Sequence, residues 1–322
     1  MNKVENRSEI VFLYDIKDAN PNGDPMDDNK PRIDEETEIN IVTDVRLKRT
    51  IRDYLHDFKH KEIFIIKAVN DNGTQKTRKE RLKEHGIDKK ADMKQLLDKY
   101  TDLRLFGATI AVEGKSTNWI GPVQFKFGRS LHKVDPQVVK GTSVMPSGED
   151  KGTGTFIQTQ ILYYSLICFY GIINENAAKE TNLTEDDINL LLDGIWNGTK
   201  NLITRSKIGQ TPRFLLRVIY NKDNYHIGNL DKGIKLVYAK DDRDVTDGKE
   251  IRGISELKID ISDLIKTISQ NKEKIKKIEF EVGPSVVFMV NKEAIDGSSI
   301  KEVFIKNEIK SEQIEHLNLD KE

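Results

Sequence analysis

Apolar residues along the chain change repeatedly between strand-like and helix-like spacing, and this order predicts the fold class. Residues 10–16 form a short apolar run rich in β-branched and aromatic side chains, which is typical of a buried strand. Leu47, Ile51 and Leu55 then recur at every fourth position, which predicts the buried face of a helix over 43–57. The same reasoning predicts further strands at 63–69, 122–134, 157–173 and 214–220, with a buried helix as the alternative for 157–173, and a helix capped by Thr184.

The order of these elements is strand, helix, strand, strand–hairpin–strand, helix, strand. This order contains a βαββαβ ferredoxin-like plan, which is also the plan of the RNA recognition motif. We therefore expect an α+β protein with a ferredoxin-like core. The aromatic octapeptide common in RNA recognition motifs is absent, so the pattern alone does not establish RNA binding. The last third alternates short strands with one capped helix, over 234–238, 262–271, 278–282 and 286–290.

Three insertions separate the elements of this core. Residues 18–42 form a long loop with the turn sequence Asn-Pro-Asn-Gly-Asp-Pro, and loops of this length are often functional. Residues 75–100 read as a charged helical insertion. Residues 135–156 predict a projecting hairpin, because their central part is rich in Gly, Ser and Pro. We find no repeat and no linker, so we expect one domain over 1–322.

Basic residues crowd the first two turns of the helix predicted at 43–57. They are Arg46, Lys48, Arg49 and Arg52. The amino-terminus of a helix offers free backbone N–H groups and a partial positive charge, so these cations predict a cradle for phosphates. The alternative is a solvated helix face with local ion pairs, such as Arg49 with Asp53.

A second basic segment follows the helix capped by Thr184, with the sequence KNLITRSKIGQTPR. Its Gly and Pro allow the backbone to approach a ligand closely, so its cations are candidate RNA contacts: Lys200, Arg205, Lys207 and Arg213. Arg129 lies on an alternating strand and has two open roles, RNA contact or pairing with an acidic neighbour.

Composition limits the remaining possibilities. The 322 residues carry 52 basic and 53 acidic side chains, so the formal net charge of -1 disfavours nucleic-acid binding by overall charge but permits a local basic groove. Cys168 is the single cysteine, which excludes an internal disulfide and a CxxC zinc site. No apolar run is long enough to span a membrane, and the first ten residues contain no apolar segment of the kind found in signal peptides. We expect a cytoplasmic protein without cofactor, metal or membrane contact.

Several separate segments of the sequence together resemble one family. They read YDIKDANPNGDP, KPRIDEETEINIVTDVRLKRTIRDYL, LRLFGATI, GPVQFKFGRSL and NGTKNLITRSKIGQTPR. The sequence is similar to the CRISPR-associated Cas7 family, the backbone subunit of the Cascade surveillance complex. The pattern looks most like the type I-B branch, with type I-C next. The resemblance covers about residues 8 to 220 and weakens beyond them.

The resemblance implies a non-catalytic RNA-binding subunit for antiviral defence. Members of the family polymerise as a helical filament along one CRISPR RNA (crRNA), whose exposed bases pair with target DNA beside other Cascade subunits. It implies an RRM-like palm with finger, web and thumb insertions, which match 70–120 (fingers and web) and 135–156 (thumb). Guide phosphate contacts would be Arg46, Lys48, Arg49 and Arg52, and Met145 or Phe156 would stack at a kinked nucleotide.

Acidic residues in the first loop offer a rival prediction. Asp15, Asp18, Asp24, Asp27, Asp28 and Asp34 are candidate Mg²⁺ ligands for metal-dependent RNA cleavage, as in related type III backbone subunits. Asp is also favoured in turn loops for local hydrogen bonding, and the type I branch is non-catalytic. We therefore expect no enzymatic activity and no metal site.

Overall fold

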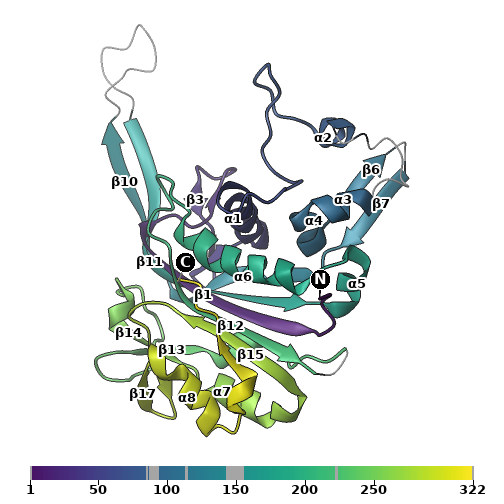
Figure 1. Cartoon of the computed structure of the whole chain (residues 1–322). Coiled ribbons are helices and arrows are strands. Elements are labelled where there is room, and N and C mark those ends of the chain that lie inside the picture. Colours follow the sequence, from purple (N-terminus) through teal and green to yellow (C-terminus); the bar gives the residue numbers. More distant parts are fainter. Residues whose placement is uncertain are drawn as a thin grey trace.

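A computed structural model describes residues 2–84, 86, 94–112, 115–142, 156–221 and 224–320 (Figure 1). It confirms the α+β class. A ten-stranded sheet forms its centre in the order β18-β15-β12-β1-β11-β9-β5-β4, with β8 and β10 also paired to β11. The strands are β1 (Ser8–Ala19), β4 (Ile33–Asp34), β5 (Ile39–Val42), β8 (Val123–Phe125), β9 (Gly128–Lys133), β10 (Pro136–Thr142), β11 (Phe156–Ile173), β12 (Thr211–Tyr220), β15 (Ile275–Val282) and β18 (Ile314–His316).

Strand β1 lies at the middle of the sheet because its side chains are buried on both faces. It pairs antiparallel with β11 on one side and with β12 on the other, so Phe12 lies opposite Phe169 and Leu215. Alternate residues point to opposite faces of a strand. Val11 and Leu13 accordingly join one apolar core, whereas Phe12 and Tyr14 join the other.

Two helices cover the face to which Tyr14 points. Helix α1 (Asp44–Asp57) begins where the Thr43 hydroxyl accepts a hydrogen bond from the Arg46 N–H, as its capping sequence predicts. Helix α6 (Glu185–Lys200) begins at Thr184 in a capping box. The two helices pack closely through α6 glycines, since a Cβ on Gly194 would lie 2.9 Å from the Ile51 side chain.

The C-terminal part of the chain covers the opposite face of the sheet (Figure 1). It contains a second sheet in the order β13-β14-β16-β17, in which β14 and β16 run parallel to each other. Its elements are η2 (Leu230–Gly233), β13 (Lys235–Tyr238), η3 (Ile254–Glu256), β14 (Leu257–Asp260), α7 (Ser262–Gln270), η4 (Lys272–Lys274), β16 (Val287–Val290), β17 (Glu293–Asp296), η5 (Gly297–Ser299), α8 (Ile300–Lys306) and η6 (Ser311–Gln313).

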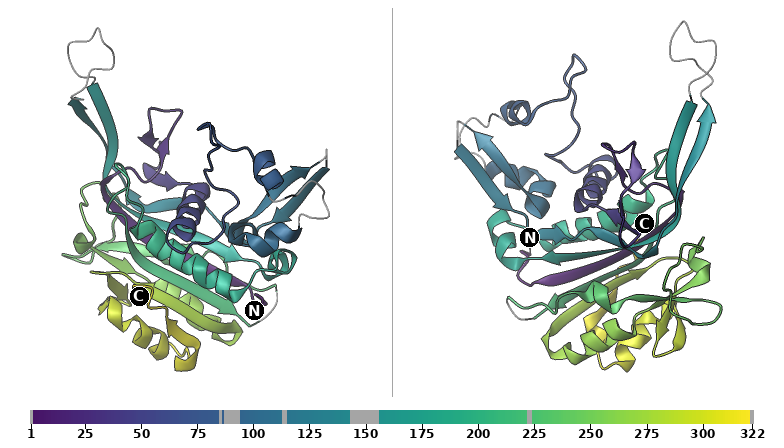
Figure 2. Two further views of the ribbon diagram at one scale, coloured as in Figure 1. Left: turned by 45° about the horizontal axis from the view of Figure 1, so that its top comes forward. Right: turned by 180° about the vertical axis from the view of Figure 1, so that it is seen from behind.

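The insertion after α1 has a small apolar core of its own, which includes Phe64, Tyr100 and Ile110. Its elements are α2 (Arg78–Glu84), α3 (Lys94–Lys99), α4 (Thr101–Phe106), β6 (Gly107–Val112) and β7 (Lys115–Ile120). Two short strands, β2 (Gly23–Asp24) and β3 (Lys30–Pro31), pair within the first loop, and α5 (Glu175–Thr181) follows β11. The insertion and the β10–β11 hairpin lie on opposite sides of α1 (Figure 2).

Two predicted strands need correction. Residues 63–69 form no strand, because the N–H groups of Phe64 and Ile65 bond to the Asp102 carboxylate at 2.8 and 3.1 Å. The strand predicted over 122–134 divides into β8 and β9 on either side of Lys126. Within the described ranges, no helix is both long and apolar enough to cross a lipid bilayer.

His132 is buried in β9, and its burial predicts how the stability of the fold changes at acidic pH. Its Nε2 accepts a hydrogen bond from the Leu166 N–H at 3.2 Å, and its ring stacks on Tyr164. Burial lowers the pKa of His132 below 6.5, although nearby Asp247 and Glu250 oppose this shift. On acidification, the unfolded chain therefore binds a proton at a higher pH than the folded protein does. The stability contributed by the neutral, buried His132 is complete above about pH 6.5 and is lost as the pH falls below it. We expect the urea midpoint to fall more steeply from about pH 6.5 to 5 in the wild type than in His132→Gln. Parallel pH profiles for the two proteins would contradict this assignment.

Candidate nucleic-acid interface

The first loop joins the start of α1 to the second basic segment. The Asn22 Oδ1 accepts hydrogen bonds from the N–H and the hydroxyl of Thr43, both at 2.9 Å. The Asn20 N–H donates to the Ser206 carbonyl oxygen at 2.8 Å. The Asn-Pro-Asn-Gly turn thus holds the start of α1 and the loop at 201–210 side by side. The cations of these two segments are therefore fixed close to one another.

Six of the nine predicted contact residues are tied to carboxylates. The pairs are Lys48 with Asp44, Arg49 with Asp53, Arg52 with Asp102, Arg129 with Asp34, Lys200 with Asp320, and Arg213 with Asp15. Arg46, Arg205 and Lys207 form no ion pair with any described residue. The structure therefore separates these three cations, which keep their charge available, from six whose charge is already balanced.

Three of the paired cations are also largely buried. Lys48 contacts Gln124 at 3.2 Å and lies over the Phe106 ring, so it joins α1 to the insertion. Arg52 lies 4.9 Å from the centre of the same ring and binds Asp102, which is fully buried. The Arg213 guanidinium donates to the Pro284 carbonyl at 2.7 Å as well as pairing with Asp15. These side chains position the surrounding elements.

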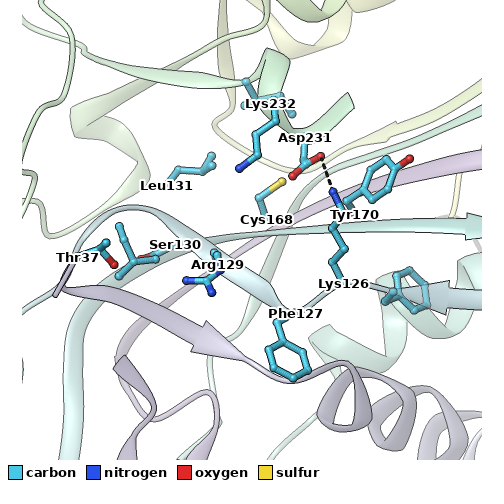
Figure 3. A pocket seen from close by; sticks show the side chains of 13 residues that line it. Thr37, Lys126, Phe127, Arg129, Ser130, Leu131, Cys168, Tyr170, Asp231 and Lys232 are labelled. Atoms are coloured by element: carbon cyan, nitrogen blue, oxygen red, sulfur yellow. Dashed lines mark ion pairs between the residues drawn. The ribbon is translucent and has the colours of Figure 1, made fainter. Parts of the chain in front are cut away.

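Arg129 lies on the other face of the sheet. It pairs in register with Cys168, which belongs to the core beneath the C-terminal layer. Its side chain lines a separate hollow of about 850 Å³ that also contains Lys126, Phe127 and Lys232 (Figure 3). The sheet therefore separates Arg129 from the cations of α1. Cys168 itself is buried, and burial raises the pKa of its thiol.

Arg46 and Lys207 lie together, partly buried, where α1 meets the loop at 201–210. The Arg46 Nη2 donates to the Thr50 hydroxyl at 2.9 Å, but its Nε is buried without a hydrogen-bond partner. Burial lowers the pKa of Arg46. Burial lowers the pKa of Lys207 too, and the charge of Arg46 lowers it further. Both cations are partly desolvated, and the charge of Arg46 disfavours that of Lys207, so an anion would stabilise this site.

A further unsatisfied polar atom lies beside Arg46. The Gln210 Nε2 is buried without a hydrogen-bond partner. Gln210 and Tyr14 line the same small hollow as Arg46 and Thr50. Buried polar groups are rarely left unpaired, and each one calls for an explanation. The hollow has a volume of about 10 Å³, which is room for about one water molecule, so it does not hold a phosphate itself.

The loop at 201–210 presents apolar side chains beside its cations. Ile203 is 69% exposed and Ile208 is 58% exposed. Between them, Arg205 donates to the Thr159 hydroxyl at 3.1 Å and links the loop to the base of the hairpin. Apolar side chains next to cations suit a ligand with both flat bases and phosphates. Of the two predicted kink residues, Met145 lies outside the described residues, and Phe156 begins β11 without a described side chain.

The acidic residues of the first loop do not converge. Asp15 binds Arg213 and the Tyr164 hydroxyl, and its burial raises the pKa of its carboxyl. Asp24 pairs with Arg32, and Asp27 pairs with Lys30, both at 2.7 Å. In the described part of the chain, no three side chains of His, Cys, Asp or Glu come together as metal ligands.

Sequence reasoning did not select Gln210, Thr50 or Asn20. Tyr14 belongs to the core under α1 and lines the Arg46 hollow. The Asn-Pro-Asn-Gly string marks Asn20 as a turn residue only. No signal in the sequence marks Gln210, because its place beside Arg46 depends on the direction in which the chain passes from the loop at 201–210 into β12.

Comparisons with known proteins agree on one family. Residues 6–262 match the family described as CRISPR-associated protein Cas7. The CRISPR-associated protein Cas7 of Haloferax volcanii is 33% identical over 319 residues, covering 88% of this chain and 91% of the relative. A chain of a solved structure titled CRISPR RNA-guided surveillance complex has a TM-score of 0.51 at 12% identity, covering 86% of this chain and 88% of its own. A second, titled CRISPR RNA-guided surveillance complex, pre-nicking, has a TM-score of 0.52 at 11% identity, with 96% and 95% covered.

The two structural likenesses show a shared fold, and the sequence matches show descent. The family match covers more than half of this chain, and the Haloferax relative aligns across nearly its full length. Both agree with the resemblance carried by the first loop and α1. This chain belongs to the CRISPR-associated protein Cas7 family.

Proposed function

We propose that this protein is a non-catalytic backbone subunit that binds a CRISPR RNA within a type I Cascade complex in the cytoplasm. The observation that carries the proposal is the pair formed by Arg46 and Lys207, two partly buried cations without ion pairs among the described residues. An RNA phosphate would supply the missing negative charge, and charge-assisted hydrogen bonds of this kind are strong. The Arg46 guanidinium and the Lys207 ammonium would provide the donors.

The proposed contact residues fall into groups according to the partners that their side chains already have. Arg46, Lys207 and Arg205 would bind guide phosphates, with the exposed parts of Arg49 and Lys200 at the edges. Lys48, Arg52 and Arg213 would act by positioning α1 and β12, because carboxylates already bind them. Arg129 would serve another surface, and Met145 and Phe156 stay predictions for a kinked nucleotide. Phosphate contacts hold the guide without reading its sequence, which is left to base pairing with target DNA.

The strand order supports an RRM-like palm for this proposal. Strands β12, β1, β11 and β9 are adjacent and antiparallel, with α1 and α6 as the crossovers. This arrangement is that of a βαββαβ core. We infer one domain over 1–322, with the segment at about 70–120 as fingers and web and the hairpin at about 135–156 as a thumb. The type I-B branch remains our prediction for the subtype.

The binding of many copies of this protein to one RNA would strengthen their attachment to it. Each copy offers few phosphate contacts, so its own affinity is modest, and the filament gains from many copies on one RNA. The solved chains with this fold carry titles of RNA-guided surveillance complexes, which supports partners of the same kind here: further copies of this chain, other Cascade subunits and target DNA paired to the guide.

The test is to purify the protein, measure its absorbance ratio at 260 and 280 nm, and sequence any bound nucleic acid. We expect discrete RNA that carries CRISPR repeat and spacer. Heterogeneous cellular RNA would support RNA binding without the Cascade role. Protein that is free of nucleic acid, and stays free when offered guide RNA, would contradict the proposal.

A further inference from the structure

The hollow that Arg129 lines has no part in the guide contacts proposed above. It lies between the central sheet and the C-terminal layer and has a volume of about 850 Å³ (Figure 3). β9 and β11 line it with Arg129 and Cys168, and η2 lines it with Asp231 and Lys232. Pockets for small ligands usually have volumes of about 300–1,000 Å³. The hollow therefore has the size of a small-molecule site.

Three cations and one carboxylate line this hollow. The Lys232 ammonium forms no hydrogen bond or ion pair with any residue that the structure describes. Arg129 reaches Asp34 only at 3.4 Å, and its side chain is 51% exposed. The Lys126 Nζ donates to the Asn229 Oδ1 at 2.8 Å, which holds this ammonium at the hollow. The positive charge that remains would be balanced by an anionic ligand.

The carboxylate of the hollow lacks a hydrogen-bond donor. The Asp231 Oδ1 is buried without a hydrogen-bond partner. The Lys126 Nζ pairs with it at 3.9 Å, a distance too long for a hydrogen bond (Figure 3). Buried acceptors are rarely left without a donor. A simple anion would leave this oxygen unpaired, so a ligand that suits the hollow carries hydroxyl or amino donors as well as negative charge.

Apolar side chains complete the lining of the hollow. Phe125, Leu131 and Ile234 belong to it, and Phe127 lines it with 52% of its surface exposed. Aromatic side chains of this kind stack on nucleobases without regard to their identity. Acidic side chains in nucleotide sites bind ribose hydroxyls. A ribonucleotide therefore combines the three required parts in one molecule: phosphates, hydroxyl donors and a flat base.

We propose that the hollow between β9 and η2 binds a free ribonucleotide. Arg129 and Lys232 bind its phosphates, Asp231 accepts from its ribose hydroxyls, and Phe127 packs against its base. The proposal does not rest on guide binding, because the central sheet separates this hollow from Arg46. A ligand that contacts β9 and η2 together joins the C-terminal layer to the sheet, so the nucleotide also raises the Tm of the protein.

The test is equilibrium dialysis of the full chain, freed of nucleic acid, against labelled ATP and labelled dATP. We expect the wild type to prefer ATP by about tenfold, because dATP lacks one hydroxyl that donates to a carboxylate. Asp231→Ala should bring this ratio close to one. Lys232→Glu should weaken ATP binding by about tenfold or more, through loss of a charge-assisted hydrogen bond. Phe127→Ala should weaken it by about fivefold or more, through loss of stacking.

Two control variants match these substitutions in the same layer of the fold. Lys266→Glu reverses an exposed cation on α7, and Ile305→Ala shortens a side chain on α8 that is 41% exposed. Both should bind ATP within about twofold of the wild type, as is usual for surface substitutions. Lys232 and Phe127 are exposed themselves, so their variants should keep the circular dichroism spectrum of the wild type.

Several outcomes would overturn the proposal. The wild type could fail to bind ATP, or could bind tripolyphosphate as tightly, which would show attraction of anions alone. Lys266→Glu could weaken binding as much as Lys232→Glu, which would indicate general electrostatics. The preference for ATP over dATP could be absent or could survive Asp231→Ala. A tetraribonucleotide could bind more tightly than ATP and respond to the same variants, which would assign the hollow to an RNA chain.

Discussion

We expect guide RNA to dissociate from a protein in which Arg46 and Lys207 are both replaced by glutamine. Each substitution removes a cation that forms no ion pair with a described residue, so each would cost a charge-assisted hydrogen bond to phosphate. Such bonds contribute about 1.5–3 kcal/mol. The expected loss is therefore on the order of tenfold to a hundredfold in affinity for each residue, and more for a filament that depends on many copies. Fluorescence anisotropy with a labelled guide measures this loss.

The double variant should remain as stable as the wild type. Burial lowers the pKa of both side chains, which means that the folded state gains nothing from their charge. Thermal unfolding monitored by circular dichroism should give an unchanged or slightly higher Tm. The matched control is Lys266→Gln with Lys306→Gln, two exposed lysines on α7 and α8 that should leave RNA binding intact. A double variant that folds normally and still binds guide with wild-type affinity would disprove the Arg46–Lys207 site.

We expect the replacement of Asp102 with alanine to detach the insertion from α1. Its fully buried carboxylate accepts hydrogen bonds from the Arg52 Nε at 3.0 Å and from two backbone N–H groups of residues 64 and 65. The variant leaves a largely buried guanidinium uncompensated and two amides without partners. Breaking a buried ion pair in this way costs about 3–5 kcal/mol. Chemical denaturation measures the cost, and hydrogen exchange locates it, with protection lost across residues 63–106.

Asp98→Ala is the control for this experiment, because Asp98 lies exposed on the neighbouring helix α3. Exposed substitutions of this kind usually change stability by less than about 0.5 kcal/mol. Equal effects of the two substitutions would show that Asp102 does not hold the insertion. Normal stability in Asp102→Ala would lead to the same conclusion.

The sequence predicts the central elements well because their signals are local. Thr43 and Thr184 mark the starts of α1 and α6 through their capping hydroxyls, and the spacing of Leu47, Ile51 and Leu55 shows the buried face of α1. The strand predicted at 63–69 was wrong because Asp102, more than thirty residues away, takes up its N–H groups. Local apolar content contains no information about such a partner.

Charge pairing between distant residues explains what the sequence could not show about the site. The pairing of Arg49 with Asp53 was foreseen as an alternative, since four residues separate them on one helix. Arg52 with Asp102, Arg213 with Asp15 and Lys200 with Asp320 pair across the fold instead. A sequence shows which residues are cations, but only the fold shows which of them are already balanced.

One continuous strand joins the centre of the sheet to the projecting hairpin. β11 runs for 18 residues, pairing with β1 at its inner part and with β10 at its outer part. At about 3.3 Å per residue, this strand spans roughly 60 Å. No loop interrupts the strand between these two parts, so we expect the hairpin to keep its direction relative to the sheet. In a filament of such subunits, the length of β11 would then set the distance between neighbouring copies, independently of the RNA sequence.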